Sequence, residues 1–208
     1  MAKRSKLEPS RPAQIRTRRA YFELPFGQLH VRTAFPATGG FDEQFPLFCV
    51  HASDRSSRAF GGFLESIAAR RSVYAPDLPG CGESDPSSPD LGTGAAAVRD
   101  LARDLRLRRI DLLGVGDGSG IALDVAVAAP DLVRRLVLFG ANALDRLSLI
   151  AQPCLILAMG APSADARRRA LGLPSSAQYV EAPEFGDDPF ARAPDAVAVR
   201  VGAFLDRP

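Results

Sequence analysis

The chain has 208 residues, 46% of them apolar and 24% charged, with a formal net charge of +2. This balance is typical of one soluble globular domain with a substantial core. No apolar run reaches the roughly 18 residues of a membrane helix, and the N-terminal charges are not followed by the apolar stretch of a secretory signal. The chain has three cysteines, Cys49, Cys81 and Cys154. Because their number is odd and no CxxC spacing occurs, we expect no disulfide framework and no standard zinc site. A reducing, cytoplasmic location is the simplest interpretation.

The N-terminal segment is strongly basic. Residues 1–20 hold seven basic residues and one acidic residue, so the rest of the chain is net acidic. Such an arm could contact nucleic acid or anionic membrane lipid. No aromatic residues interleave with the charges, however, and a solvated, disordered tail is the favoured interpretation. We place the arm at residues 1–19 and the folded domain at residues 20–208.

The first half of the chain predicts four strands and one helix. Strands are expected at residues 21–24, 28–35, 45–50 and 72–76. Residues 57–70 carry apolar side chains at helical spacing. His30 falls on the second strand, and we interpret it as a surface or edge residue with no special role.

The second half alternates strands with helices. Strands are expected at residues 110–115, 136–139, 154–159 and 178–181, and helices at residues 93–105, 119–129, 164–171 and 194–205. Repeated strand–helix alternation of this kind predicts a mostly parallel sheet with helices on both faces.

Three segments suggest a specific fold. Residues 50–53 read VHAS at the end of a strand. Residues 74–85 read YAPDLPGCGESD, a loop rich in glycine and proline. Residues 110–118 read IDLLGVGDG, a strand that runs into a glycine-rich turn before a helix.

In this order and spacing the three segments resemble the α/β-hydrolase family, over about residues 20–206. The resemblance implies a three-layer α/β fold with a nucleophile at a sharp strand-to-helix turn, between two small residues. It also implies that the residue after His51-Ala52, which is Ser53, supplies a backbone N–H to the oxyanion hole. The small residues are present as Gly114 and Gly118.

The residues that the family uses for catalysis are not at the matching positions. Gly116 stands at the nucleophile position, Ser163 near the acid position, and Asp187 at the histidine position. Asp165 could serve as the acid only if its loop shifts, and no histidine follows His51. Only residues 141–153 separate two of the strands, too few for the cap domain that many members insert there. The resemblance therefore implies a fold without its usual Ser-His-Asp triad.

Several side chains near the expected pocket could substitute. We interpret Asp117 as a helix N-cap in preference to a displaced nucleophile, and Ser119 as a hydroxyl in the first helical turn. Cys81 could react if His51, the one candidate base, lies beside it. Asp117, Asp187 and Asp165 could together hold Mg²⁺ or Ca²⁺, although solvated carboxylates are the commoner outcome.

We therefore expect no metal and no cofactor, and a small-molecule ligand or protein partner that the sequence does not identify. The leading hypothesis is a catalytically degenerate member that binds a ligand or partner, in effect a pseudoenzyme. The alternative is an atypical hydrolase acting on esters or thioesters, or a lyase or isomerase that uses the retained pocket.

Overall fold

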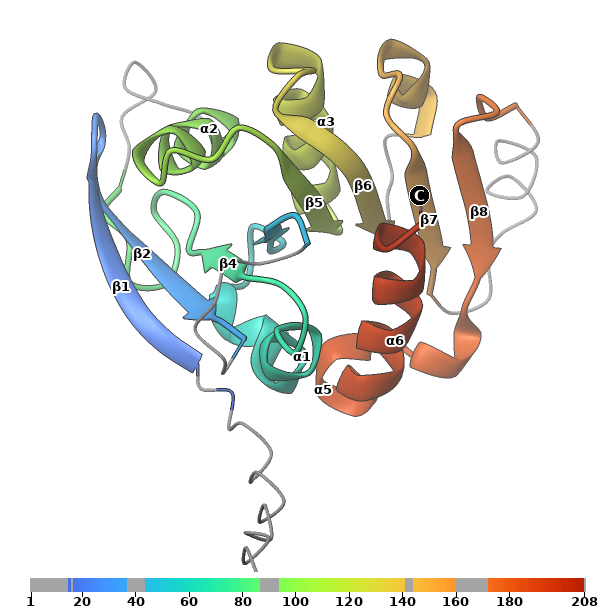
Figure 1. Cartoon of the computed structure of the whole chain (residues 1–208), viewed down its shortest axis with the longest axis horizontal. Coiled ribbons are helices and arrows are strands. Elements are labelled where there is room, and N and C mark those ends of the chain that lie inside the picture. The colour runs from blue at the N-terminus through green and yellow to red at the C-terminus, as the bar shows by residue number, and fades with distance from the viewer. Residues whose placement is uncertain are drawn as a thin grey trace, which may run out of the picture.

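The computed structural model describes residues 15, 17–36, 44–86, 94–140, 144–159 and 172–207. Its centre is an eight-stranded sheet with the order β1-β2-β4-β3-β5-β6-β7-β8 (Figure 1). Its strands are β1 (Thr17–Leu24), β2 (Gly27–Ala34), β3 (Leu47–Val50), β4 (Val73–Pro76), β5 (Ile110–Val115), β6 (Val133–Phe139), β7 (Cys154–Ala158) and β8 (Ala177–Glu181). The pairs β1–β2 and β2–β4 are antiparallel, and all the other pairs are parallel.

Helices cover both faces of the sheet. The helices α2 (Gly94–Asp104) and α3 (Gly118–Ala128) pack on one face, while α1 (Gly61–Ile67), α5 (Pro189–Arg192) and α6 (Pro194–Leu205) pack on the other (Figure 1). Short 3₁₀ helices lie at Ser57–Phe60, Leu144–Leu149 and Pro183–Phe185. Successive residues of β3 show why both faces are covered. Phe48 and Val50 enter one core cluster, and Leu47 and Cys49 enter the other, because side chains alternate along a strand.

This architecture confirms the predicted fold class, an α/β-hydrolase-like, mostly parallel sheet. The predicted helix at residues 57–70 is a 3₁₀ turn followed by a helix that ends at Ile67, and β6 begins three residues before the predicted strand. The predicted helix at residues 164–171 lies outside the described residues.

Strand β1 begins three residues before the expected start of the folded domain at residue 20. Thr17, Arg18 and Arg19 belong to β1 and pair with Ala34, Thr33 and Arg32 of β2. The Arg19 guanidinium also contacts the Glu83 carboxylate at 3.1 Å. Backbone pairing with β2 brings these residues into the sheet despite their charge. The remainder of the basic arm, apart from Ile15, lies outside the described residues.

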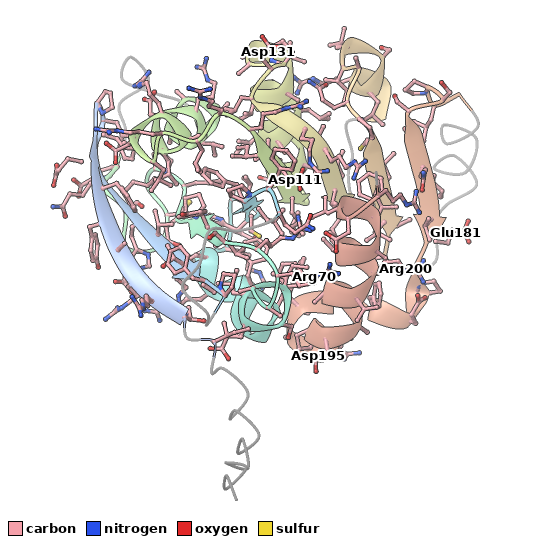
Figure 2. The ribbon with its side chains drawn as sticks, in the orientation of Figure 1. Arg70, Asp111, Asp131, Glu181, Asp195 and Arg200 are labelled. Atoms are coloured by element: carbon pink, nitrogen blue, oxygen red, sulfur yellow. The ribbon has the colours of Figure 1, made fainter. Side chains whose placement is uncertain are left out.

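A buried ion cluster ties the last helix to the sheet. Arg71 and Asp111 are almost fully buried and form an ion pair at 3.0 Å, and Asp111 also accepts two bonds from Arg134. Arg71 reaches Asp206, directly after α6, and the Arg134 guanidinium binds the carbonyl of Leu205. Asp111 and Arg70 are labelled in Figure 2; Asp111 is fully buried, whereas Arg70, which pairs with the other oxygen of Asp206, is exposed. The bond from Arg134 satisfies the Leu205 carbonyl, which the end of α6 would otherwise leave unpaired.

Within the part of the chain that the structure describes, no helix is long and apolar enough to span a membrane.

Candidate functional site

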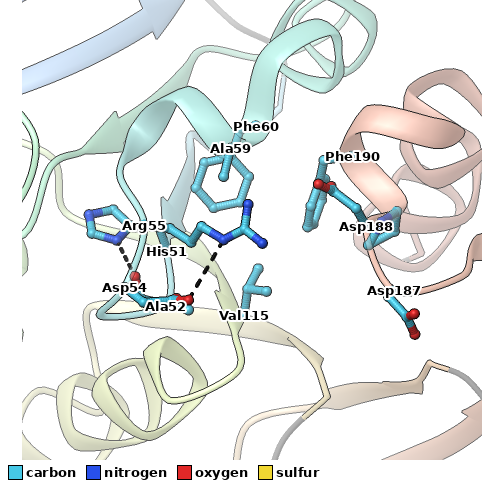
Figure 3. A pocket seen from close by; sticks show the side chains of 11 residues that line it. His51, Ala52, Asp54, Arg55, Ala59, Phe60, Val115, Asp187, Asp188 and Phe190 are labelled. Carbon is cyan, nitrogen blue, oxygen red and sulfur yellow. Dashed lines mark hydrogen bonds and ion pairs between the residues drawn. The ribbon is translucent and has the colours of Figure 1, made fainter.

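The candidate site lies where the strand order changes direction. β3 and β5 are neighbours, but the chain leaves β3 toward β4 on one side and leaves β5 toward β6 on the other. In open α/β sheets, ligands bind at the carboxyl ends of the strands at such a point. A cavity of about 180 Å³ lies here. It is lined by His51, Ala52, Asp54, Arg55, Ala59, Phe60, Val115, Asp187, Asp188, Pro189 and Phe190 (Figure 3).

The turn from β5 to α3 has the geometry of a nucleophile elbow. Gly116 has φ +57°, the left-handed conformation that strains other residues. A Cβ on Gly114 would lie 2.6 Å from the Cα of Ser119, and a Cβ on Gly118 would lie 2.4 Å from the carbonyl oxygen of His51. Glycine is therefore required at both flanking positions, as the sequence predicted. At Gly116 itself the nearest atom to an added Cβ is the Ala52 Cβ at 3.4 Å, so there is room for a small side chain.

The Asp117 carboxylate does not cap its own helix. Asp117 directly precedes α3 but makes no side-chain capping bond, which corrects the sequence interpretation. Its Oδ1 instead accepts the backbone N–H of Ser53 at 2.9 Å. The pKa of Asp117 is lowered, first by the Ser53 hydroxyl and further by the backbone N–H groups of Ser53, Asp117 and Gly118, against a smaller opposing effect of burial. The carboxylate thus lies against the two backbone donors, Ser53 and Asp117, that form the oxyanion hole in an elbow of this type.

His51 is buried and both of its ring nitrogens are occupied. Nδ1 lies 2.7 Å from the carbonyl oxygen of Ala52, and Nε2 accepts the backbone N–H of Leu78 at 2.9 Å. This arrangement fits the neutral tautomer with its proton on Nδ1. Burial lowers the pKa of His51 against the effects of the Ala52 carbonyl and nearby aspartates. His51 is therefore placed to order the loops around the cavity, and neither ring nitrogen is available to take a proton from a substrate.

The other predicted candidates are separated from one another. The Cys81 thiol lies 3.5 Å from the Ser53 carbonyl oxygen, and burial followed by Asp77 and Asp117 raises its pKa, which opposes thiolate formation. Both His51 nitrogens are already hydrogen-bonded, so neither is placed to act as a base for Cys81. The buried Ser119 hydroxyl lies 3.4 Å from the Phe139 carbonyl oxygen in the first turn of α3, as predicted. Ser163 and Asp165 lie outside the described residues.

Asp187 is exposed at the rim of the cavity, opposite the ends of β3 and β5. It follows Gly186, whose φ of +63° turns the chain toward α5. Asp188 caps α5, accepting the N–H of Ala191 at 3.3 Å. Phe190 brings its ring within 5.1 Å of the Phe60 ring. Sequence reasoning missed Asp188 and Phe190, although an aspartate directly before proline is a readable helix-start signal.

The interpretation of His30 as a surface residue is wrong. His30 is 1% exposed, and its Nδ1 lies 2.8 Å from Asp77 Oδ2. Asp77 also accepts the backbone N–H groups of Ser57 at 2.6 Å and Glu83 at 2.9 Å. Burial acts to raise the pKa of Asp77, but these hydrogen bonds outweigh it and the pKa is lowered. The pair fixes the loop of residues 77–85 against β2, and a histidine beside Leu29 and Val31 in a buried strand was the missed signal.

Among the described residues, no three His, Cys, Asp or Glu side chains converge into a group that could hold a metal ion. Asp117 and Asp187, which the sequence suggested as metal ligands, occupy different positions: the first is bound to Ser53 and the second lies at the cavity rim. Asp165 lies in the part of the chain not described.

The chain belongs to the alpha/beta hydrolase family, whose model matches residues 47–208. It is 32% identical over 155 residues to an uncharacterized protein of Mycobacterium tuberculosis, which covers 73% of this chain and 45% of that protein. It is 35% identical over 105 residues to 2-hydroxymuconate semialdehyde hydrolase of Pseudomonas sp., which covers 46% of this chain and 36% of that enzyme. The chain thus matches less than half the length of each of these relatives.

Solved structures support the same fold. Naproxen esterase from Bacillus subtilis superposes with a TM-score of 0.75 at 17% identity, covering 92% of each chain. At this identity the likeness establishes the arrangement of the sheet and helices, and the chemistry has to be argued from the residues of the site.

Proposed function

We propose that this chain is a catalytically degenerate member of its family that binds a small ligand and does not hydrolyse it. The observation that carries the proposal is Gly116 at the nucleophile position of a well-formed elbow. Glycine has no side chain to attack a carbonyl carbon, and the backbone around it keeps the geometry that a nucleophile would need.

The positions of the two histidines support the same conclusion. The chain has two histidines, and both are buried. Both ring nitrogens of His51 are hydrogen-bonded, to Ala52 and Leu78. His30 is paired with Asp77. Asp187, which lines the cavity, is the residue that we assign to the family's histidine position. An exposed carboxylate is too weak a base to take over the role of a catalytic histidine near neutral pH.

The retained cavity favours a ligand-binding role. Its floor includes the phenyl rings of Phe60 and Phe190, and charged groups lie at its rim. Residues 140–153 join β6 to β7, and we expect no cap domain in so short a connection. A site without a cap excludes water poorly, which suits reversible binding better than hydrolysis by a dehydrated nucleophile.

The test is an assay of the full chain with p-nitrophenyl esters and acyl thioesters of two to six carbons. We expect no turnover above the buffer rate. Removing the serine of a working triad costs about 10⁶ in kcat, and the losses of triad members do not add. Gly116→Ser alone should remain inactive, whereas Gly116→Ser with Asp187→His should give a weak burst of acylation if both positions are correctly aligned.

The alternative function is an atypical hydrolase, which the name of the Pseudomonas relative favours. Robust ester turnover by the unmodified chain, retained in Asp117→Ala and Cys81→Ala variants, would establish that alternative and overturn the proposal.

A further inference from the structure

The second feature of the elbow is the position of the Asp117 carboxylate. In an elbow of this kind, the oxyanion of the reaction intermediate is held by two backbone N–H groups, one directly after the nucleophile and one from the loop after β3. Here those groups belong to Asp117 and Ser53. The Ser53 N–H already donates to the Asp117 carboxylate at 2.9 Å, and the Ser53 hydroxyl and the N–H of Gly118 stabilise the same charge.

We propose that Asp117 is a specificity-determining residue: its carboxylate is an internal anion that fills the former oxyanion hole and excludes carboxylate and phosphate ligands from the adjoining cavity. The inference rests on the proposed function, because it concerns the ligand of the same cavity. It assigns that ligand to the neutral or cationic class.

Charge around the cavity agrees with this assignment. Asp54, Asp187 and Asp188 line the cavity, whereas Arg55 is the one basic side chain among its lining residues that bears a full charge near neutral pH. The Nε of Arg55 lies 3.9 Å from Oδ2 of Asp54, so the two side chains form an ion pair. His51 does not offset the acidic rim, because burial lowers its pKa and favours the neutral ring. An incoming anion would meet these carboxylates as it enters the cavity.

The backbone places the Asp117 carboxylate next to Ser53. The Asp117 carboxylate reaches Ser53 because Gly116 turns the chain through φ +57°, which places residue 117 beside the loop that follows β3. The neighbouring Gly116 position faces Ala52, a residue of the cavity wall. Ser53, which binds the Asp117 carboxylate, stands between Ala52 and Asp54, two residues that line the cavity, so the filled hole adjoins the cavity wall.

The experiment compares three probes of equal length: butanoate, butanamide and butylammonium. A cavity of about 180 Å³ has room for roughly six water molecules, enough for a four-carbon chain. Binding is followed by ¹H–¹⁵N NMR titration at neutral pH. We expect wild-type protein to bind butanoate at least tenfold more weakly than butylammonium, because the hydrogen bonds that could hold the carboxylate are already made.

Two variants separate the filled hole from the overall charge. Asp117→Ala opens the hole and removes the charge, and we expect it to tighten butanoate binding about tenfold or more. Asp117→Asn removes the charge but leaves an oxygen acceptor in place, so its gain should be small. Asp187→Ala is the control, since it removes one rim carboxylate and leaves the hole filled.

Three results would overturn the inference: equal butanoate affinity in wild type and Asp117→Ala, an equal gain in Asp187→Ala, or no butanoate binding in a folded Asp117→Ala protein. If Asp117→Ala does not fold, the wild type still provides a test. The Ser53 amide proton should shift with an acidic titration that disappears in Asp117→Asn, and an unshifted Ser53 amide would refute the contact. Ester turnover would instead refute the proposed function, so the two failures are distinguishable.

Discussion

Gly116 and Ala52 face each other at the edge of the cavity, and a Cβ built on Gly116 would lie 3.4 Å from the Cβ of Ala52. A small side chain at position 116 would therefore have room beside Ala52. Gly114 and Gly118 lie so close to Ser119 and His51 that any side chain there would collide with backbone. The conformation of Gly116, and not a lack of space, sets the cost of replacing it.

The first prediction concerns that cost. Gly116→Ala should destabilise the protein by about 1–2 kcal/mol, because alanine is strained at φ +57°. Gly120→Ala is the matched control. Gly120 lies within α3, and an added Cβ would meet no atom within 4 Å beyond its chain neighbours and the helix's own backbone, so that change should be neutral or stabilising by up to about 1 kcal/mol. Urea unfolding monitored by circular dichroism measures both changes, and equal effects would contradict the assigned elbow geometry.

The second prediction concerns Asp77, which accepts hydrogen bonds from His30, Ser57 and Glu83. Asp77→Asn replaces an acceptor by an amide that also presents N–H groups to these donors. We expect a loss of about 2–3 kcal/mol in the free energy of unfolding. The control is Asp100→Asn, which breaks an exposed ion pair with Arg103 and should cost less than about 0.5 kcal/mol.

The stabilisation by Asp77 should also depend on pH. Its folded-state pKa is below the ordinary value, so its contribution is complete above the ordinary aspartate pKa and is lost as pH falls through the folded value. Wild-type stability should therefore drop more steeply than that of Asp77→Asn as the pH falls below the ordinary aspartate pKa of about 4. Parallel pH curves for the two proteins would show that the hydrogen bonds do not favour the ionised carboxylate.

The sequence was enough to predict features that depend on neighbouring residues, but not those that depend on contacts between distant ones. Strand alternation and the motifs at residues 74–85 and 110–118 were enough to predict the sheet and the elbow. The role of His30 could not be predicted, because its partner Asp77 lies 47 residues away and is brought near only by β2–β4 pairing. Asp117 was misread for the same reason: a carboxylate before a helix predicts a local cap, and the competing donor, Ser53, comes from another loop.

The third prediction concerns the buried ion cluster of Arg71, Asp111 and Arg134. Asp111→Ala should destabilise the protein by about 3–5 kcal/mol, because it leaves Arg71 and Arg134 without their shared buried partner. Asp124→Ala removes the partner of Arg146 at the surface and should cost less than about 1 kcal/mol. Thermal and chemical unfolding of both variants provides the comparison. A small effect at Asp111 would mean that water or other groups compensate the two guanidinium ions.

The fourth prediction concerns the partly exposed Glu83 carboxylate, whose pKa is lowered to about 2. The largest cause is the Tyr21 hydroxyl, which donates to Glu83 at 2.8 Å, followed by the hydrogen bond from Arg58. Tyr21→Phe should therefore raise the pKa of Glu83 toward the ordinary glutamate value, and Arg58→Gln should raise it less. A ¹³C NMR titration of the glutamate carboxyl groups measures both shifts. The reverse order would show that charge, more than the tyrosine hydrogen bond, controls this carboxylate.

The last prediction concerns the basic arm and where the folded unit begins. Residues 1–14 are rich in charge and proline and poor in apolar side chains, so we expect their deletion to leave the melting temperature unchanged. Deletion of residues 1–19 removes Thr17, Arg18 and Arg19, which pair with β2, and also the Arg19 contact to Glu83. That longer deletion should lower the melting temperature by several degrees, since a loss of about 1 kcal/mol corresponds to roughly 2–4 °C in a domain of this size. Differential scanning calorimetry of the two truncated proteins distinguishes the cases. Equal melting temperatures would show that the first residues of β1 add no stability, and a large loss on removing residues 1–14 would mean that the arm contributes to the fold.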